Sequence, residues 1–136
     1  MSLVHTEIVL KNAADVSNAK AGIIEKAGVR QIAVRALVDT GAWTLVINDE
    51  IRGKLGLDIM GEKSGVLADG TRAVCKTAGP LEVWWKDRYT ICEALILPHA
   101  REPLLGAIPL EGLDLTINPA REEVVGAHGN LALYVI

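Results

Sequence analysis

The chain has 136 residues, half of them hydrophobic, and a formal net charge of −3, which suits one domain with a single buried core over residues 1–136. No apolar run reaches the about 18 residues of a membrane span, and without a Lys or Arg cluster we expect no nucleic-acid partner. The first residues lack a basic stretch followed by an apolar one, so we expect a cytoplasmic protein with no membrane contact.

The apolar pattern predicts many short strands and only short helices. Asn48 is placed to cap one helix and Gly56 to end it. Because no helix of 10–15 residues separates the strands, the pattern favours an all-β, barrel-like fold over βαβ units. In chain order we expect a strand at 6–11, an exposed turn at 12–18, strands at 29–38 and 44–47, a helix at 49–55, hairpins pairing 66–67 with 72–76 and 81–85 with 89–97, a short helix after Gly106, and last strands at 113–118 and 130–136.

The triplet Asp39-Thr40-Gly41 follows the predicted strand at 29–38 and precedes the return strand. It therefore lies on a tight loop between two strands. Asp39 supplies an acid/base group, and the short hydroxyl of Thr40 can bind neighbouring backbone. Gly41 allows the chain to turn, and its exposed N–H can approach the carboxylate and stabilise its charge.

The cysteines and histidines do not indicate a redox or metal site. Cys75 and Cys92 lack Cys-x-x-Cys spacing, so we expect two reduced, partly buried thiols. His5, His99 and His128 are far apart and show no metal-ligand spacing. We therefore expect neither a metal nor a cofactor.

Three segments resemble those of a known protease family. Residues 38–42 (VDTGA) and 103–111 (PLLGAIPLE) resemble the two signature segments of retropepsin-like aspartic proteases, and 65–72 (GVLADGTR) is similar to their flap hairpin. Order and spacing match over residues 30–118, and we identify the chain with a cellular, bacterial or archaeal branch rather than a viral one. The resemblance implies a small closed β-barrel with a flap hairpin and one or two short helices.

The resemblance also implies an activity. Two carboxylates that share one proton can activate a water for peptide hydrolysis. Since the chain has one Asp-Thr-Gly, the second carboxylate must come from a second copy, which implies a homodimer acting on a peptide or protein substrate. Asp39 would be catalytic, with Thr40 and Gly41 supporting the loop. The implied substrate-binding residues are Ala42, Trp43, Leu67, Ala68, Asp69, Gly70, Leu105 and Gly106.

Two positions depart from the retroviral pattern. Retroviral members have an acidic or small polar residue where this chain has Trp43, and commonly an Arg where it has Ala107. The ion pair that those residues form is not available here, so dimer support and substrate contacts must differ. The alternative hypothesis is a non-catalytic dimeric module that binds a peptide or partner on the same fold.

Two structural questions stay open at this point. Trp43 could form a wall of the cleft, or it could point into the core beneath the loop. The dimer contact could use the apolar end at 131–136, which would otherwise leave an open edge, or the segment 113–118.

Overall fold

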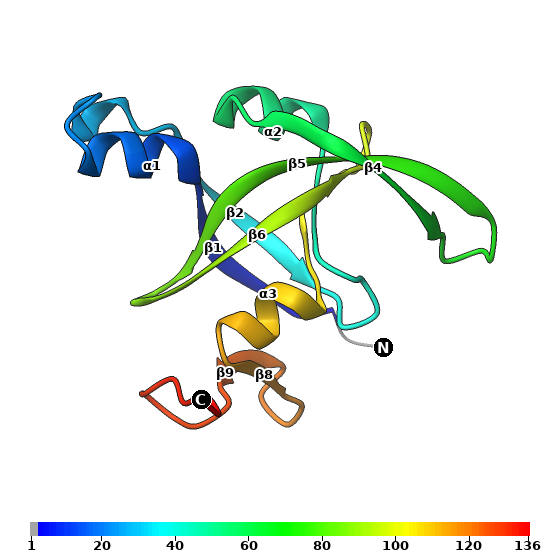
Figure 1. Ribbon diagram of the computed structural model, residues 1–136. Coiled ribbons are helices and arrows are strands. Elements are labelled where there is room, and N and C mark those ends of the chain that lie inside the picture. The colour runs from blue at the N-terminus through cyan, green and yellow to red at the C-terminus, as the bar shows by residue number, and fades with distance from the viewer. Residues whose placement is uncertain (1–2) are drawn as a thin grey trace.

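The computed structural model, which describes residues 3–136, is built around a ring of six strands (Figure 1). The ring closes because β1 (His5–Asn12) pairs with both β2 (Gln31–Val38) and β5 (Arg72–Trp85). A seventh strand, β4 (Asp58–Val66), pairs with β5 outside the ring. In spatial order the ring strands are β1 (His5–Asn12), β2 (Gln31–Val38), β7 (Leu104–Leu105), β3 (Leu45–Ile47), β6 (Arg88–Ile96) and β5 (Arg72–Trp85). The predicted all-β fold is confirmed.

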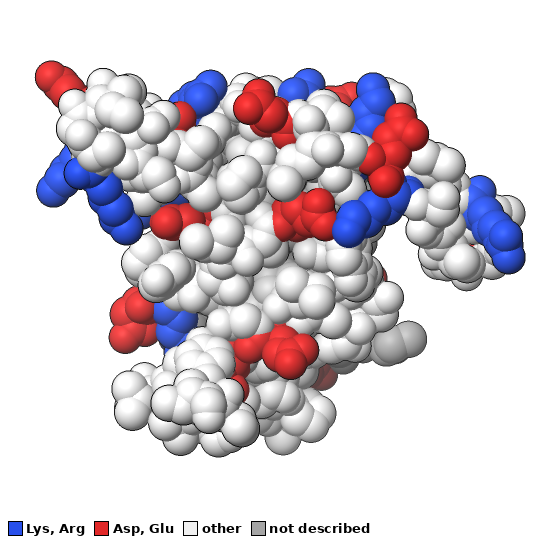
Figure 2. All heavy atoms as spheres, viewed as in Figure 1, with Lys and Arg blue, Asp and Glu red and all other residues white. Residues whose placement is uncertain are grey.

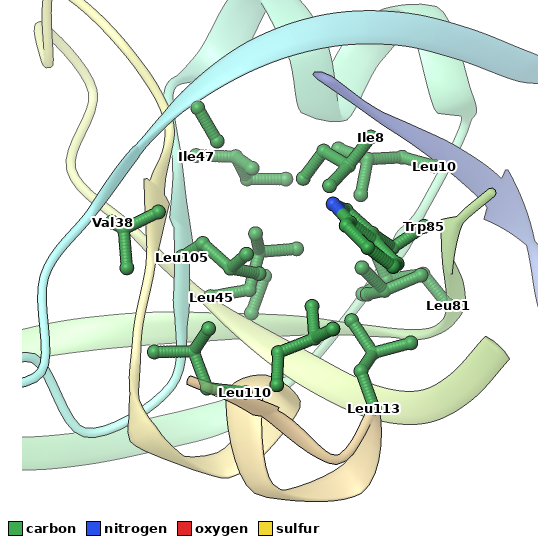
Figure 3. Packing of buried hydrophobic residues seen from close by; sticks show 14 of the residues in the cluster. Ile8, Leu10, Val38, Leu45, Ile47, Leu81, Trp85, Leu105, Leu110 and Leu113 are labelled. Carbon is green, nitrogen blue, oxygen red and sulfur yellow. The ribbon is translucent and has the colours of Figure 1, made fainter. Parts of the chain in front are cut away.

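The interior of the ring holds the hydrophobic core. Alternate residues of β1, Ile8 and Leu10, point inward and are buried, as the two-residue period of a strand requires. The core side chains come from strands and helices far apart in the sequence (Figure 3). Each fully buried aliphatic or aromatic side chain contributes about 1.5–3 kcal/mol, so this interior holds the ring together. Among those labelled in Figure 3 are Val38, Leu45, Ile47, Leu81, Trp85, Leu105, Leu110 and Leu113.

Two predicted helices are confirmed. Helix α2 (Asp49–Leu55) begins where the Asn48 side chain accepts a hydrogen bond from the Ile51 N–H at 2.9 Å, and it ends at Gly56 with φ of 60°. Helix α3 (Ala107–Gly112) follows Gly106. No helix within residues 3–136 combines the length and apolar character that a membrane span requires.

The predicted exposed turn at 12–18 is wrong, because this segment forms helix α1 (Ala13–Lys20). The turn-forming Asn12 acts as its N-cap and accepts a hydrogen bond from the Asp15 N–H at 3.0 Å. Asp15 is buried and receives two hydrogen bonds from the Arg30 side chain, at 2.8 and 3.0 Å, which hold the pKa of its carboxyl below the usual value. A short 3-10 helix, η1 (Lys26–Gly28), precedes Arg30.

The two predicted hairpins share one long strand. The segments expected at 72–76 and 81–85 are both parts of β5, which pairs with β4 on one side and β6 on the other. Gly79 and Pro80 lie within this strand, at a register shift between Ala78 and Leu81.

The predicted last strand at 130–136 is also wrong. Strand β8 (Leu115–Asn118) pairs with β9 (Glu123–Gly126), which the sequence did not indicate. Residues 131–136 run along the surface without strand pairing. They are anchored at two points, where the Leu133 N–H donates to Asp114 at 3.0 Å and the Tyr134 hydroxyl donates to the Gly112 carbonyl at 2.8 Å. The chain closes its own terminal hairpin earlier, and residues 131–136 stay outside it.

Candidate active site

The loop that follows β2 is held from behind by the segment that begins at β7. The Asp39 N–H donates to the Leu105 carbonyl at 3.0 Å. The Ala107 and Ile108 N–H groups donate to the carbonyls of Ala42 and Trp43, at 2.8 and 3.0 Å. Because both ends of the loop are bound to one crossing segment, the position of Asp39 is fixed by the backbone of the barrel.

Gly106 makes this close crossing possible. A Cβ on Gly106 would lie 2.6 Å from the Ala42 carbonyl oxygen and closer still to that of Thr44. Any side chain here would push the crossing segment away from the loop. Steric crowding therefore explains why the 103–111 segment requires glycine at position 106.

The Asp39 carboxylate is partly exposed and is oriented by its own loop. Its Oδ1 accepts a hydrogen bond from the Gly41 N–H at 2.9 Å, the contact that the sequence predicted. A Cβ on Gly41 would lie 3.2 Å from the same oxygen, tighter than most such contacts. The absence of a side chain at Gly41 thus lets its N–H approach the carboxylate.

Asp39 lies in the wall of a cavity of about 900 Å³ between its loop and the β4–β5 hairpin. In Figure 1 this hairpin extends away from the ring on the side where the loop after β2 lies. The lining is mostly apolar, which suits the side chains of an extended peptide. The lining residues are Asp39, Gly41, Ala42, Trp43, Val46, Lys63, Ser64, Gly65, Val66, Leu67, Ala68, Cys75, Leu95, Leu97 and Leu104. We call this cavity the cleft.

Four of the eight residues expected to bind substrate line the cleft: Ala42, Trp43, Leu67 and Ala68. The other four do not. Leu105 has no exposed surface because it belongs to the core, and Gly106 backs onto the loop carbonyls. Asp69 and Gly70 form the tip of the hairpin, outside the cleft lining.

Asp69 has a local role at this tip. Its Oδ1 accepts hydrogen bonds from the Thr71 hydroxyl at 2.6 Å and the Thr71 N–H at 2.9 Å, which together hold the pKa of Asp69 below its usual value. Gly70 follows with φ of 87°, a conformation that favours glycine. The segment Asp69-Gly70-Thr71 is therefore a turn, and Asp69 does not line the cleft.

Sequence reasoning missed part of the cleft, namely the wall formed by β4. The hairpin was expected to start at Val66, yet β4 reaches back to Asp58 and places Lys63 opposite Cys75 of β5. Extending the antiparallel register backwards from the Asp69-Gly70 turn would have found this wall. Leu95 and Leu97 were assigned to a strand region, but nothing local indicated that they face the cleft.

Trp43 lies at the cleft and is 45% exposed, so the alternative that it points into the core is wrong. The Lys63 ammonium lies 4.5 Å from the centre of its indole ring. The same ammonium lies 2.8 Å from Glu93 Oε1 on β6. Three separate segments of the chain therefore meet at this edge of the cleft.

Thr40 faces away from the cleft, toward α3 and β8. It is exposed, and within residues 3–136 its hydroxyl has no hydrogen-bond partner. It lines a shallow recess of about 430 Å³ together with Leu110 and Asp114 and with residues 115–117 of β8. The active-site loop and the terminal hairpin thus share one surface.

Other reactive groups do not gather into a second site. Among residues 3–136, no three His, Cys, Asp or Glu side chains are grouped to hold a metal ion. Both cysteines are free, and burial raises the pKa of the Cys92 thiol to about 11, which keeps it protonated. On the face drawn in Figure 2, basic side chains are scattered among acidic ones rather than gathered into one patch.

Comparison with known proteins decides the fold. No protein-family model and no curated protein matches the sequence. Among solved structures, the EIAV protease complexed with the inhibitor HBY-793 is similar, with a TM-score of 0.58 over 97% of this chain and 94% of that one. The chain has a retropepsin-like fold. At 15% sequence identity, the likeness concerns the architecture alone.

Proposed function

We propose that the chain is an aspartic endopeptidase that acts as a homodimer, with the Asp39 carboxylates of two copies flanking one water. The observation that carries the proposal is a partly exposed Asp39, held by the Gly41 N–H at 2.9 Å, in the wall of a 900 Å³ cleft beneath a hairpin. The likeness in fold to a retroviral protease supports it. With it go three predictions from the sequence: one domain over residues 1–136, a cytoplasmic location, and a cellular branch of the family.

The chemistry follows from one proton shared by two carboxylates. Like charges about 3 Å apart do not both ionise easily, so one Asp39 is the base and the other the acid. The base takes a proton from the water while the water oxygen attacks the peptide carbonyl carbon. The acid protonates the carbonyl oxygen. Transfer of a proton to the amide nitrogen then lets the C–N bond break. We expect the greatest activity in mildly acidic solution, where the pair holds one proton.

The decisive variant is Asp39→Asn, which keeps the size of the side chain but removes the shared proton. We expect cleavage of a mixed peptide library to fall by about 10²–10⁴-fold, while the sedimentation coefficient of the dimer is unchanged. Asp87→Asn, in the exposed turn between β5 and β6, is the matched control and should cleave like the wild type. Wild-type cleavage by Asp39→Asn would refute the catalytic role.

A non-catalytic dimeric module that binds a peptide or partner protein is the second candidate. The observation that favours it is the bulk at the cleft edge, where Trp43 and Lys63 lie against each other 4.5 Å apart. A statine-type mimic of the tetrahedral intermediate separates the two candidates, because an aspartic protease binds it more tightly than a substrate. The binding module would be favoured by a wild-type protein that binds peptides, does not bind this mimic and cleaves no member of the library.

A further inference from the structure

Lys63 introduces a positive charge into a cleft that is otherwise largely apolar. Of the residues that line the cleft, Lys63 and Asp39 are the only charged ones in the described chain. The side chain of Lys63 is 48% exposed and extends from β4, the strand outside the ring. Near apolar walls a charge is screened less than in bulk water, so Lys63 acts more strongly on a bound ligand.

The ammonium of Lys63 is held in place rather than free in solution. Glu93 Oε1 lies 2.8 Å from Nζ, and the Trp43 ring centre lies 4.5 Å from it. A lysine ammonium has three N–H donors; Glu93 takes one, and the indole face lies against another side. The third is available to a ligand. Glu93 itself is 25% exposed and does not line the cleft, so the cleft faces the cation.

We propose that Lys63, held by Trp43 and Glu93, makes this edge of the cleft a subsite for an acidic side chain of a bound peptide. The inference rests on the proposed peptide-binding function of the cleft and adds the class of substrate to it. An Asp or Glu side chain accepts the remaining N–H of Lys63, while its methylene groups pack on the exposed part of the indole. A basic side chain at the same position is repelled.

The test measures binding, so that it does not depend on turnover. Fluorescein-labelled peptides of one apolar sequence, with Glu, Gln or Lys placed at each position in turn, are titrated against the Asp39→Asn protein at low salt. At one position we expect the Glu peptide to bind about fivefold more tightly than the Gln peptide, and the Lys peptide more weakly than both. The Glu preference should shrink as salt is added.

Variants of Lys63 assign the preference to this residue. Lys63→Gln should remove the difference between Glu and Gln peptides, and Lys63→Glu should reverse it in favour of Lys. Lys54→Gln makes the same charge change on α2, where Lys54 pairs with Glu50 at 3.2 Å on the surface, and should leave the preference intact. Folding of each variant is checked by circular dichroism.

The outcomes separate the subsite from the proposed function. Peptides that bind the Asp39→Asn protein with no preference for Glu overturn the subsite alone, and this comparison needs no Lys63 variant. A Glu preference that survives Lys63→Gln overturns the assignment to Lys63. A protein that binds none of the peptides contradicts the peptide-binding cleft as well.

Discussion

At the scale of single residues, Trp43 and Trp85 occupy two different environments in the same small barrel. Trp43 is 45% exposed at the cleft, whereas Trp85 is 7% exposed in the core and donates its indole N–H to Thr6 at 2.9 Å. Trp43 lies on the loop that follows Asp39, whereas Trp85 is the last residue of β5. We therefore expect Trp43 to contribute specificity and Trp85 to contribute stability.

We expect Trp43→Ser to broaden the cleavage or binding profile and to cost only about 1 kcal/mol of stability, because the indole is half exposed. Trp85→Ser is the control and should cost about 3–5 kcal/mol, as buried aromatic truncations do. Thermal melting and a peptide-library profile on both variants are the measurements. A strongly lowered melting temperature for Trp43→Ser with an unchanged profile would end the subsite role.

At the scale of elements, the crossing of the 104–108 segment behind the Asp39 loop is the contact on which the site depends. Gly106→Ala should lower the free energy of unfolding by about 3 kcal/mol, since the new methyl group meets the carbonyls of Ala42 and Thr44. Gly53 provides a matched control on α2, where a Cβ meets open space. Gly53→Ala should stabilise by about 0.5–1 kcal/mol, and urea denaturation of both variants measures the contrast. A Gly106→Ala protein as stable as the wild type would show that the crossing tolerates a side chain.

At the scale of the whole molecule, the proposed dimer needs a surface beside Thr40. The recess that Thr40 shares with α3 and β8 leads us to expect the partner there rather than at the apolar end. Among residues 3–136, β8 and β9 pair only with each other, so the hairpin has an open edge for a partner strand.

Sedimentation velocity tests this assembly. The wild type should sediment as a dimer at high micromolar concentration, and removal of residues 131–136 should leave it dimeric because that end is anchored to its own chain at Asp114 and Gly112. Thr116→Lys on β8, at an exposed residue of the recess, should shift it to the monomer, since a lysine would be desolvated in the contact. A monomeric truncation with a dimeric Thr116→Lys would assign the contact to the apolar end instead.

What the sequence by itself determined about this protein is local. The cap of α2 at Asn48, its end at Gly56, the tight turn at Asp69-Gly70 and the hydrogen bond from Gly41 to Asp39 were all predicted. Each depends on atoms only two or three residues apart, so neighbouring residues suffice to set the geometry. The all-β class followed as well, because many short predicted strands without a helix of 10–15 residues between them exclude βαβ units.

Only the tertiary structure decided which distant residues meet. The closure of the ring between β1 and β5, the presence of Lys63 and Leu97 in the cleft, and the burial of Leu105 depend on strand register. A shift of one residue turns every side chain to the other face, and register is settled by the packing of the whole core. For the same reason the apolar residues 131–136 were misread, since apolar composition alone does not specify whether a segment pairs with another strand.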